Sequence, residues 1–434
     1  MDSQESLGQR LRDLRLRRGV SQAQLAFPEL SDSYVSLIES GKRLPAPNVI
    51  ELLARKLGCS ASYLASGVSD ETVTELRMTL KYGEISLENG EVEEARASFA
   101  KILNHPSLSA IPDMLYEVRW GFARALEASG DLENAVAELE NLVGMISPEE
   151  DPDRWAWLHI ALCRCYRERG DFGAGVRTGE EGLRRLTGVQ ARWTESTVML
   201  GVTLLGVFLE RGDLVYAHQL ANRLIVRAED VGSARARAAA YWNAGMLAEY
   251  RGHPDEGLRL GERALALLGE TDDTRNLARL RMECGRLTLR ARPDQAERAR
   301  DLIQQARQEL ADCAASEIDH VRSVMELAKA EIALDRPAEA VRLAKEAMDL
   351  LGHSQRFVLA ADVLIVLANG YVGLDQIDAA VEVLQHAAEA LEGMQSQRQA
   401  AQTWFDLAEL LGRTGDEKQR AQAYRHACAC AGLG

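Results

Sequence analysis

The sequence predicts an all-α protein in which a small domain of five helices precedes a solenoid of helical hairpins. Two observations carry this prediction. Ala, Leu, Arg and Glu dominate the composition, only 5% of the residues are aromatic, and 10 of the 434 are proline, which favours helices over strands. From residue 70 onward a glycine, usually followed by an acid, recurs about every 40 residues, which is typical of stacked helical hairpins.

The charge is divided unevenly along the chain. The whole sequence carries a net charge of −15. Residues 1–66 hold nine Lys or Arg and seven Asp or Glu, a net +2, so the rest of the chain carries −17. Attraction to phosphate acts locally at physiological salt, so a slightly basic head on an acidic body is compatible with binding to nucleic acid.

Several classes of protein are disfavoured by what the sequence lacks. No run approaches 18 consecutive apolar residues and the first residues are too charged for a secretory signal, so we expect a cytoplasmic protein without a membrane span. The seven cysteines give no disulfide framework, and the pairs Cys163/Cys165 and Cys428/Cys430 lie on predicted helices, where we expect buried, reduced thiols. Phosphate loops, nucleophile motifs and metal-ligand spacings are missing, so we expect no enzyme activity, no metal and no cofactor.

The first of the five short helices is amphipathic. Leu7, Leu11 and Leu14 lie on one face, at the spacing of a helix. Arg15 and the other basic residues are assigned to the remaining faces, and Gly19 is expected to end the helix.

The second and third helices are predicted to form a helix-turn-helix unit, because only a tight turn separates them. Ser21, Ser31 and Ser60 are expected to be the N-caps of the second, third and fifth helices. Val35 and Ile38 of the third helix should point into the core, which leaves its polar residues facing outward.

Three signatures in this head resemble those of XRE-type, lambda-repressor-like DNA-binding domains. The segments SQAQLA, SYVSLIESGKRLP and LGCSASYL follow one another at family-like spacings over about 60 residues. The resemblance implies that the third helix enters the major groove of double-stranded DNA. Carried over by position, it assigns base edges to Asp32, Ser33, Ser36 and Leu37, the backbone or an outer base to Gln22, and phosphates to Tyr34, Ser40, Lys42 and Arg43.

Two carboxylates in this region have structural interpretations. Asp32 could accept a hydrogen bond from a cytosine amino group, or its charge could stabilise the N-terminus of the third helix. Glu39 is expected to be an internal structural carboxylate rather than a reader of bases.

The rest of the chain is predicted to contain nine repeats that resemble tetratricopeptide repeats with long units of about 40 residues. In most units a small residue five positions after the turn would let the helices approach closely; these are Ala95, Ala135, Ala217, Ala340 and Ala380. Gly257 replaces the alanine and Arg292 the turn glycine, so we expect local irregularity there. The turns are placed at Gly90, Gly130, Gly170, Gly212, Gly252, Arg292, Asp335, Asp375 and Gly415.

These patterns divide the chain into three parts. We expect a DNA-binding domain over residues 1–66, a linker over 67–76, and a repeat domain over 77–434 that binds a ligand or partner and dimerises.

The first helix of each hairpin is expected to line a concave groove, with the residues three, six, ten and thirteen positions before each turn facing inward. Met and Trp would supply adaptable apolar contacts there, and Arg would hold carboxylates or carbonyls. The alternative to ligand binding is packing in the core for each Met and Trp, and pairing with neighbouring Glu for the cations. The residues assigned to the ligand are Trp120, Arg124, Trp157, Arg164, Arg167, Trp242, Met246, Arg279, Met282, Arg286, Arg322, Met325, Lys329 and Asn369.

The whole chain resembles XRE-type regulators with a C-terminal repeat body, including the RRNPP group of bacterial quorum-sensing regulators. The resemblance implies a homodimer on a two-fold-related DNA site, and a peptide or small-molecule effector whose binding in the groove changes the affinity for DNA. Two alternatives stay open. The repeats could be a docking scaffold for another protein, with the head only localising the complex, or the head could serve dimerisation alone.

Overall fold

The chain is helical throughout the part that the computed structural model describes, which comprises residues 7–189, 192–271, 273–313, 315–352, 357–393 and 397–433. No strand occurs within these ranges, which confirms the all-α prediction. The chain divides into two compact units, Met1–Met145 and Ile146–Gly434.

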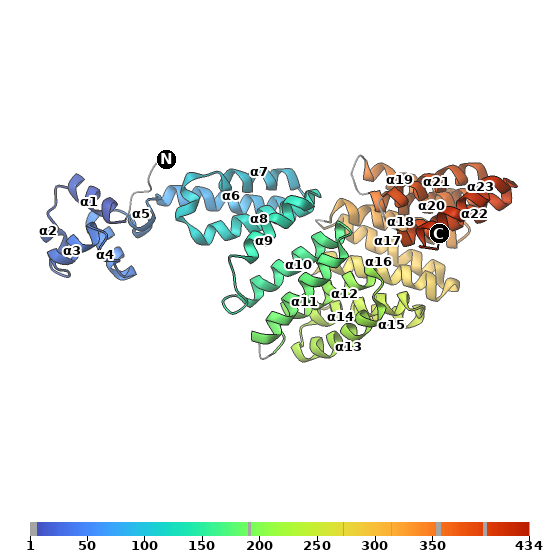
Figure 1. The fold of residues 1–434 in the computed structure, drawn as a ribbon, viewed down its shortest axis with the longest axis horizontal. Coiled ribbons are helices and arrows are strands. Elements are labelled where there is room, and N and C mark those ends of the chain that lie inside the picture. Colours follow the sequence, from blue (N-terminus) through green and yellow to red (C-terminus); the bar gives the residue numbers. More distant parts are fainter. Residues whose placement is uncertain are drawn as a thin grey trace. The chain divides into compact units, whose positions relative to one another are not determined.

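The first unit contains five short helices and two longer hairpins (Figure 1). Its described elements are α1 (Leu7–Arg17), α2 (Gln22–Ala26), α3 (Asp32–Glu39), α4 (Pro47–Leu57), α5 (Ala61–Ser66), α6 (Asp70–Glu88), α7 (Val92–Leu103), the 3-10 helix η1 (Pro106–Ala110), α8 (Pro112–Ser129) and α9 (Leu132–Val143).

The short helices begin where serine side chains cap them. The hydroxyl groups of Ser21, Ser31 and Ser60 accept hydrogen bonds from backbone N–H groups three residues further on, which confirms the predicted N-caps of α2, α3 and α5. Gly8 lets α1 cross close to α3, because a Cβ at this position would lie 2.3 Å from the carbonyl oxygen of Ile38. The core between these helices is made of Leu11, Leu25, Ala26, Val35, Ile38, Leu53, Ala54, Leu57 and Leu64, each at most 2% exposed.

The connection between the head and the hairpins is shorter than predicted. The linker was expected to extend over residues 67–76, but α6 already begins at Asp70. The hydroxyl of Ser69 caps this helix by accepting from the N–H of Thr72, and Asp70 and Glu71 place negative charge in its first turn. These local signals extend the helix backward through most of the predicted linker.

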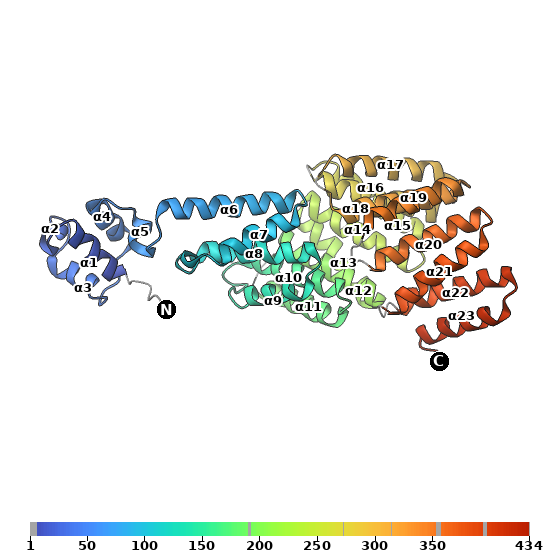
Figure 2. The same cartoon turned by 90° about the horizontal axis from the view of Figure 1, so that it is seen from above.

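The second unit consists of seven hairpins within the described residues. Figure 2 shows the helices of the last two hairpins, from α20 to α23, side by side. Its helices are α10 (Pro152–Glu168), α11 (Phe172–Val189), α12 (Glu195–Arg211), α13 (Leu214–Val231), α14 (Ala234–Tyr250), α15 (Pro254–Leu268), α16 (Thr274–Ala291), η2 (Pro293–Gln295), α17 (Ala296–Ala311), α18 (Glu317–Ala333), α19 (Pro337–Leu351), α20 (Phe357–Gly373), α21 (Ile377–Gly393), α22 (Gln397–Thr414) and α23 (Glu417–Cys430).

The predicted turn register is found in the structure. The six turn glycines have φ between 76° and 86°, and Asp335 and Asp375 adopt the same left-handed region with φ of 57°. The five small alanines are each 0% exposed, as close helix approach requires. Arg292 instead has φ of −140°, and the short helix η2 follows it, so the expected irregularity is present.

A series of polar contacts ties the N-terminal ends of alternate helices in the second unit. The hydroxyl of Ser196 on α12 donates to Asp153 on α10 at 2.6 Å, and Ser233 just before α14 donates to Glu195. Longer ties follow, from Arg235 on α14 to Asp273 before α16, and from Arg275 and Arg279 on α16 to Asp319 on α18. We call these five contacts the edge ties.

The cysteines are only partly as expected. Cys163 and Cys165 are buried in α10, whereas Cys428 on α23 is exposed. The burial pattern explains this difference, because Ala427 is one of the buried residues of α23 and Cys428, the next residue, points away from that side. None of the described helices is long and apolar enough to cross a bilayer.

Candidate nucleic-acid interface and ligand groove

The N-terminal half of α3 presents an open polar surface. Val35 and Ile38 are 0% and 1% exposed and hold the helix on the core. Ser33 and Ser36 lie exposed on the other side, and Leu37 is 42% exposed beside them. This surface is small and lacks bulky side chains at the start of the helix, which is the shape that a major groove admits.

Asp32 at the start of α3 makes a local contact. Its Oδ1 atom accepts from the backbone N–H of Ser33 at 2.8 Å. A carboxylate that accepts from an N-terminal N–H group stabilises the helix, which is the structural interpretation of this residue. The side chain is nevertheless exposed, and so it also lies within reach of a bound molecule.

Glu39 connects the three helices of this region. Its Oε1 atom accepts from Nε of Arg15 at 2.6 Å, and its Oε2 atom accepts from Nη2 of Arg15 at 3.0 Å and from Nε2 of Gln22 at 2.7 Å. Arg15 also donates to the carbonyl oxygen of Val20 at 2.9 Å. The expectation of a structural role for Glu39 is confirmed, and Gln22 is held in place while keeping its second amide hydrogen for another acceptor.

The assignment of Arg15 to an outward face was wrong, because its guanidinium is buried beside Glu39. Arg15 follows Leu11 by four residues, so the helical period already placed it at the edge of the apolar face. Burial alone would raise the pKa of Glu39, but the hydrogen bonds from Arg15 and Gln22 and the charge of Arg15 outweigh it, so this pKa lies below its ordinary value. The pair is therefore charged at neutral pH.

The loop after α3 carries two exposed cations. Gly41 has φ of 70°, and the N–H groups of Lys42 and Arg43 both donate to the carbonyl oxygen of Leu37. This folds the loop back against the end of α3 and fixes its backbone while the side chains of Lys42 and Arg43 stay exposed. Sequence reasoning did not single out the next residue, Leu44, which is 88% exposed.

Tyr34 and Ser40, the two other residues predicted to contact phosphates, are already engaged within the head. Tyr34 is half-buried and packs against the core of the head. The hydroxyl of Ser40 donates to the carbonyl oxygen of Leu37 at 3.1 Å, which leaves it as an acceptor toward any further group.

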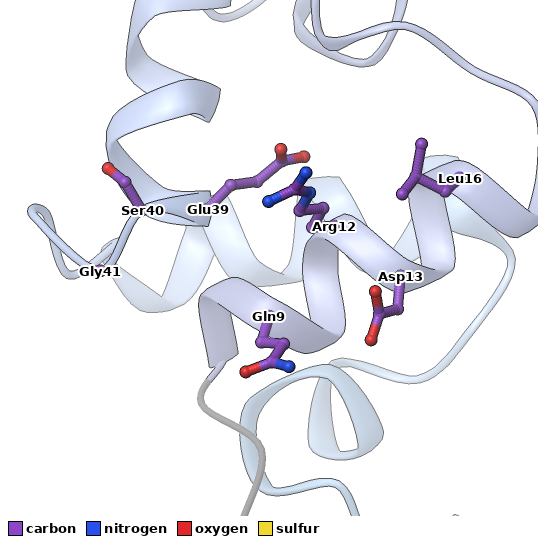
Figure 3. A pocket seen from close by; sticks show the side chains of 7 residues that line it. All are labelled: Gln9, Arg12, Asp13, Leu16, Glu39, Ser40 and Gly41. Atoms are coloured by element: carbon purple, nitrogen blue, oxygen red, sulfur yellow. The ribbon is translucent and has the colours of Figure 1, made fainter.

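A hollow of about 490 Å³ lies between α1 and the end of α3 (Figure 3). Its walls are mostly polar, and the side chain of Arg12 points toward that of Glu39. The hollow lies on the head and not on the predicted groove. It is lined by Gln9, Arg12, Asp13, Leu16, Glu39, Ser40 and Gly41.

Besides Arg167, which pairs with Glu210, three of the cations assigned to the groove are held in ion pairs. Nε of Arg279 lies 2.6 Å from Oδ1 of Asp319, and Nζ of Lys329 lies 2.7 Å from Oε1 of Glu326. Arg286 bridges Glu249 on α14 and a glutamate on its own helix. For these three cations the structure shows the pairing with acids that the sequence left open as the alternative.

Several of the predicted apolar groove residues belong to the core. Met282 and Met325 are 9% and 5% exposed, and Trp242 packs against the core between α14, α15 and α16. The two buried methionines have no surface to offer a ligand, whereas Trp242 is half-buried. Trp157, Met246 and Arg164 are half-buried and Asn369 is exposed, while Trp120 and Arg124 lie on α8 in the first unit.

Arg322 differs from the other predicted cations. It is exposed, and its charge acts on two carboxylates, Glu210 at the end of α12 and Asp362 on α20. Two hairpins separate α12 from α18 along the chain, yet the charge of Arg322 reaches Glu210. Arg167 completes this group, with its Nε 3.5 Å from Oε1 of Glu210.

The positive charges near Glu210 and Asp362 do not fully offset the desolvation of these two carboxylates. Glu210 is 45% exposed, yet the desolvation by its surroundings raises its pKa, and the charges of Arg167 and Arg322 only partly oppose this rise. Burial likewise raises the pKa of Asp362 against the opposing charges of Lys329 and Arg322. A cationic group placed beside either carboxylate would stabilise its charged form and lower its raised pKa.

Glu210 was missed by sequence reasoning, which chose its neighbour Leu209. Leu209 is 2% exposed and lies in the core, so the register was displaced by one residue in this repeat. The signal that could have revealed Glu210 is its charge two residues before the turn glycine, because a charged side chain is rarely part of a core.

Comparisons with known proteins place the two parts of the chain. The family model "Helix-turn-helix domain" matches residues 6–66, and the model "Soluble NSF attachment protein, SNAP" matches residues 308–430. No curated protein matches the sequence.

Two solved structures share the fold at low sequence identity. A Rap protein complexed with Competence and Sporulation Factor has 14% identity and a TM-score of 0.54, and the match covers 75% of this chain and 99% of that one. The apo form of the quorum sensor NprR from B. thuringiensis has 14% identity and a TM-score of 0.53, with 82% and 99% covered. The chain thus carries an N-terminal helix-turn-helix domain and a tetratricopeptide-like helical body with the fold seen in Rap and NprR.

Proposed function

We propose that this protein is a sequence-specific DNA-binding regulator, and that a peptide or small ligand bound by the second unit sets its affinity for DNA. The observation that carries the proposal is the surface of α3. Its outward side chains are exposed, its inner face is buried, and a buried ion pair fixes it to α1. A helix held in this way can present polar groups to base edges at little cost in ordering.

The proposed DNA contacts divide into two kinds. Asp32, Ser33, Ser36 and Leu37 face base edges, with Leu37 offering an apolar contact for a thymine methyl group. Gln22, Tyr34, Ser40, Lys42 and Arg43 contact the backbone. A homodimer would place two such helices on half-sites about one helical turn apart.

The proposed effector site is the group around Arg322. Its guanidinium can hold a carboxylate, and Glu210 and Asp362 can hold a cation. A short peptide carries both kinds of charge at its termini. The printed names of the two similar structures describe a complex with Competence and Sporulation Factor and a quorum sensor, which supports a signalling ligand for this fold.

Replacing Ser33 and Ser36 together by glutamate is expected to lower specific DNA affinity on the order of a hundredfold or more. Two carboxylates would be brought against base edges and phosphates, which repel them. The measurement is footprinting on sheared genomic DNA at about 150 mM salt, followed by titration of the recovered sites.

Ser62→Glu is the matched control, because Ser62 is an exposed serine on α5 of the same domain and its replacement adds the same kind of charge away from α3. It should change affinity by less than about threefold, since repulsion between separated exposed charges is screened. Equal losses in both variants, or diffuse binding of the unaltered protein, would contradict the proposed interface.

Arg322→Ala is expected to weaken effector binding by about tenfold or more, because it removes the cation that both carboxylates face. A pool of linear heptapeptides with free termini is a suitable probe, with the thermal shift of the protein as the readout. Arg342→Ala is the control, since Arg342 is an exposed arginine on α19 paired with Glu339 and Glu346. A peptide whose binding survives Arg322→Ala would place the site elsewhere.

A docking scaffold is the second candidate. The match of residues 308–430 to an attachment-protein family favours it, because it covers hairpins of the second unit. A protein that co-purifies in stoichiometric amount, together with DNA affinity that no peptide changes, would support the scaffold over the effector-controlled regulator.

A further inference from the structure

An apolar stripe runs along one side of α6. Met78, Tyr82 and Ile85 are 68%, 55% and 44% exposed, and their spacing of four and three residues places them on the same helix face. The opposite face carries Leu76 and Leu80, which are buried against α7 and α8. The helix therefore has two apolar sides, and the structure of this unit covers one of them.

This stripe is unusual for its position. α6 is the first helix of the repeat body, and terminal helices of such arrays normally turn a polar face outward to remain soluble. Three large apolar side chains in one line on a surface helix mark an interaction site more often than isolated ones do.

We propose that the stripe pairs with the same stripe of a second copy, so that two α6 helices pack antiparallel about a two-fold axis. The inference rests on the dimer that the proposed function requires, and it assigns the surface that makes it. An isologous contact of this kind needs a patch that is complementary to itself.

The charges beside the stripe provide this complementarity. Lys81 and Glu88 are both exposed and lie on the same edge of the stripe, one heptad apart, and Lys81 also pairs with Glu84 of its own helix at 3.0 Å. When Tyr82 packs on Ile85 of the partner subunit in the antiparallel arrangement, Lys81 lies opposite Glu88 of the partner subunit. The axis repeats this pair, so two opposite-charge contacts flank one apolar seam.

Other arrangements are less favourable. If Tyr82 packed on Met78 of the partner subunit, Glu75 would be brought against Ile85 of the partner subunit and lose water without gaining a cation. In a parallel pair the edge that carries Lys81 and Glu88 faces the opposite edge, where Ser86 is buried in its own unit, so the two charges do not meet. Antiparallel pairing in the first register brings the two charges together and keeps Glu75 out of the apolar seam.

Sedimentation velocity of the full-length protein over a concentration series, without DNA, tests the proposal. Tyr82→Glu should weaken the dimer by about tenfold or more, because it places charge in the apolar seam. Lys81→Glu and Glu88→Lys should each weaken it severalfold, because each turns two attractions into repulsions. The double variant Lys81→Glu/Glu88→Lys should recover the dimer, because the charges again match.

The control is Val226→Glu on α13, where another exposed apolar residue, 59% exposed, receives the same charge. It should leave the dimer unchanged, and unchanged circular dichroism should show that every variant is folded. If the single variants weaken the dimer and the double variant does not recover it, the antiparallel register is wrong. A dimer that persists in Tyr82→Glu overturns the α6 surface while the DNA-binding function stands, and a wild-type protein that is monomeric at all concentrations overturns the dimer itself.

Discussion

Replacing Arg15 by alanine is expected to lower the free energy of unfolding of the helix-turn-helix domain by about 3–5 kcal/mol. The arginine is 8% exposed and contributes two hydrogen bonds to Glu39 and one to Val20. Its removal leaves the carboxylate of Glu39 buried with only the amide of Gln22 as a polar partner among the contacts described for it. An unpaired buried charge of this kind costs more than the pair itself contributes.

Hydrogen exchange of the full-length protein is the suitable measurement. Amides of α1, α2 and α3 should lose protection in Arg15→Ala, while the helices of the second unit keep theirs. Arg17→Ala is the matched control, because Arg17 is an exposed arginine two residues later on the same helix, and it should cost about 0.5 kcal/mol or less. Equal exchange in the two variants would show that the Arg15–Glu39 pair does not hold the domain together.

Asp319→Asn is expected to destabilise the second unit. Asp319 is 3% exposed, accepts from Arg275 and Arg279, and closes a capping box with Ser316 at the start of α18. Burial would raise the pKa of Asp319, but the hydrogen bonds and charges of Arg279 and its neighbours outweigh this and lower the pKa from 3.8 to about 2. That difference corresponds to roughly 2–2.5 kcal/mol of stability at neutral pH.

The sign of the pH dependence follows from the lowered pKa. The unfolded chain binds the proton first, so the stabilisation is complete above about pH 4 and is lost as the pH falls toward 2. The gap in thermal midpoint between the wild type and Asp319→Asn should be widest at neutral pH and should narrow through this window. Asp301→Asn is the control, because the Asp301 side chain is 74% exposed, and it should show no such gap. A gap that stays constant down to pH 2 would contradict the role of the charge.

Local signals made the helix-turn-helix domain predictable. An N-cap serine accepts a hydrogen bond from the backbone N–H three residues further on, so it depends only on the local sequence. Ser21, Ser31 and Ser60 could therefore be predicted without tertiary information. The same local logic was not followed far enough at Arg15 and at Asp70. The helical period of α1 places Arg15 at the edge of its apolar face, where it is buried beside Glu39. The N-cap at Ser69 starts α6 inside the predicted linker.

The groove was harder to predict for a physical reason. Turn and small-residue positions belong to one hairpin, and they were found where the repeat placed them. Whether a residue of the first helix faces the concave side or the next hairpin depends on the twist between hairpins, which no single repeat encodes. Met282 and Met325 therefore fall in the core, and the charge of Arg322 acts on Glu210 although two hairpins separate their helices along the chain.

The edge ties differ in the side chains that make them along the second unit. Hydroxyl-to-carboxylate ties join α10 to α12 and α12 to α14, where Arg235 also reaches Glu195, and within the described residues guanidinium-to-carboxylate ties alone join α14 to α16 and α16 to α18. A serine side chain is short and holds the two helix ends close together, whereas an arginine side chain is long and can join helix ends that lie further apart. Exchanging one kind of tie for the other would change the pitch of the array at that step, so evolution can resize the groove by substitutions that no ligand ever touches.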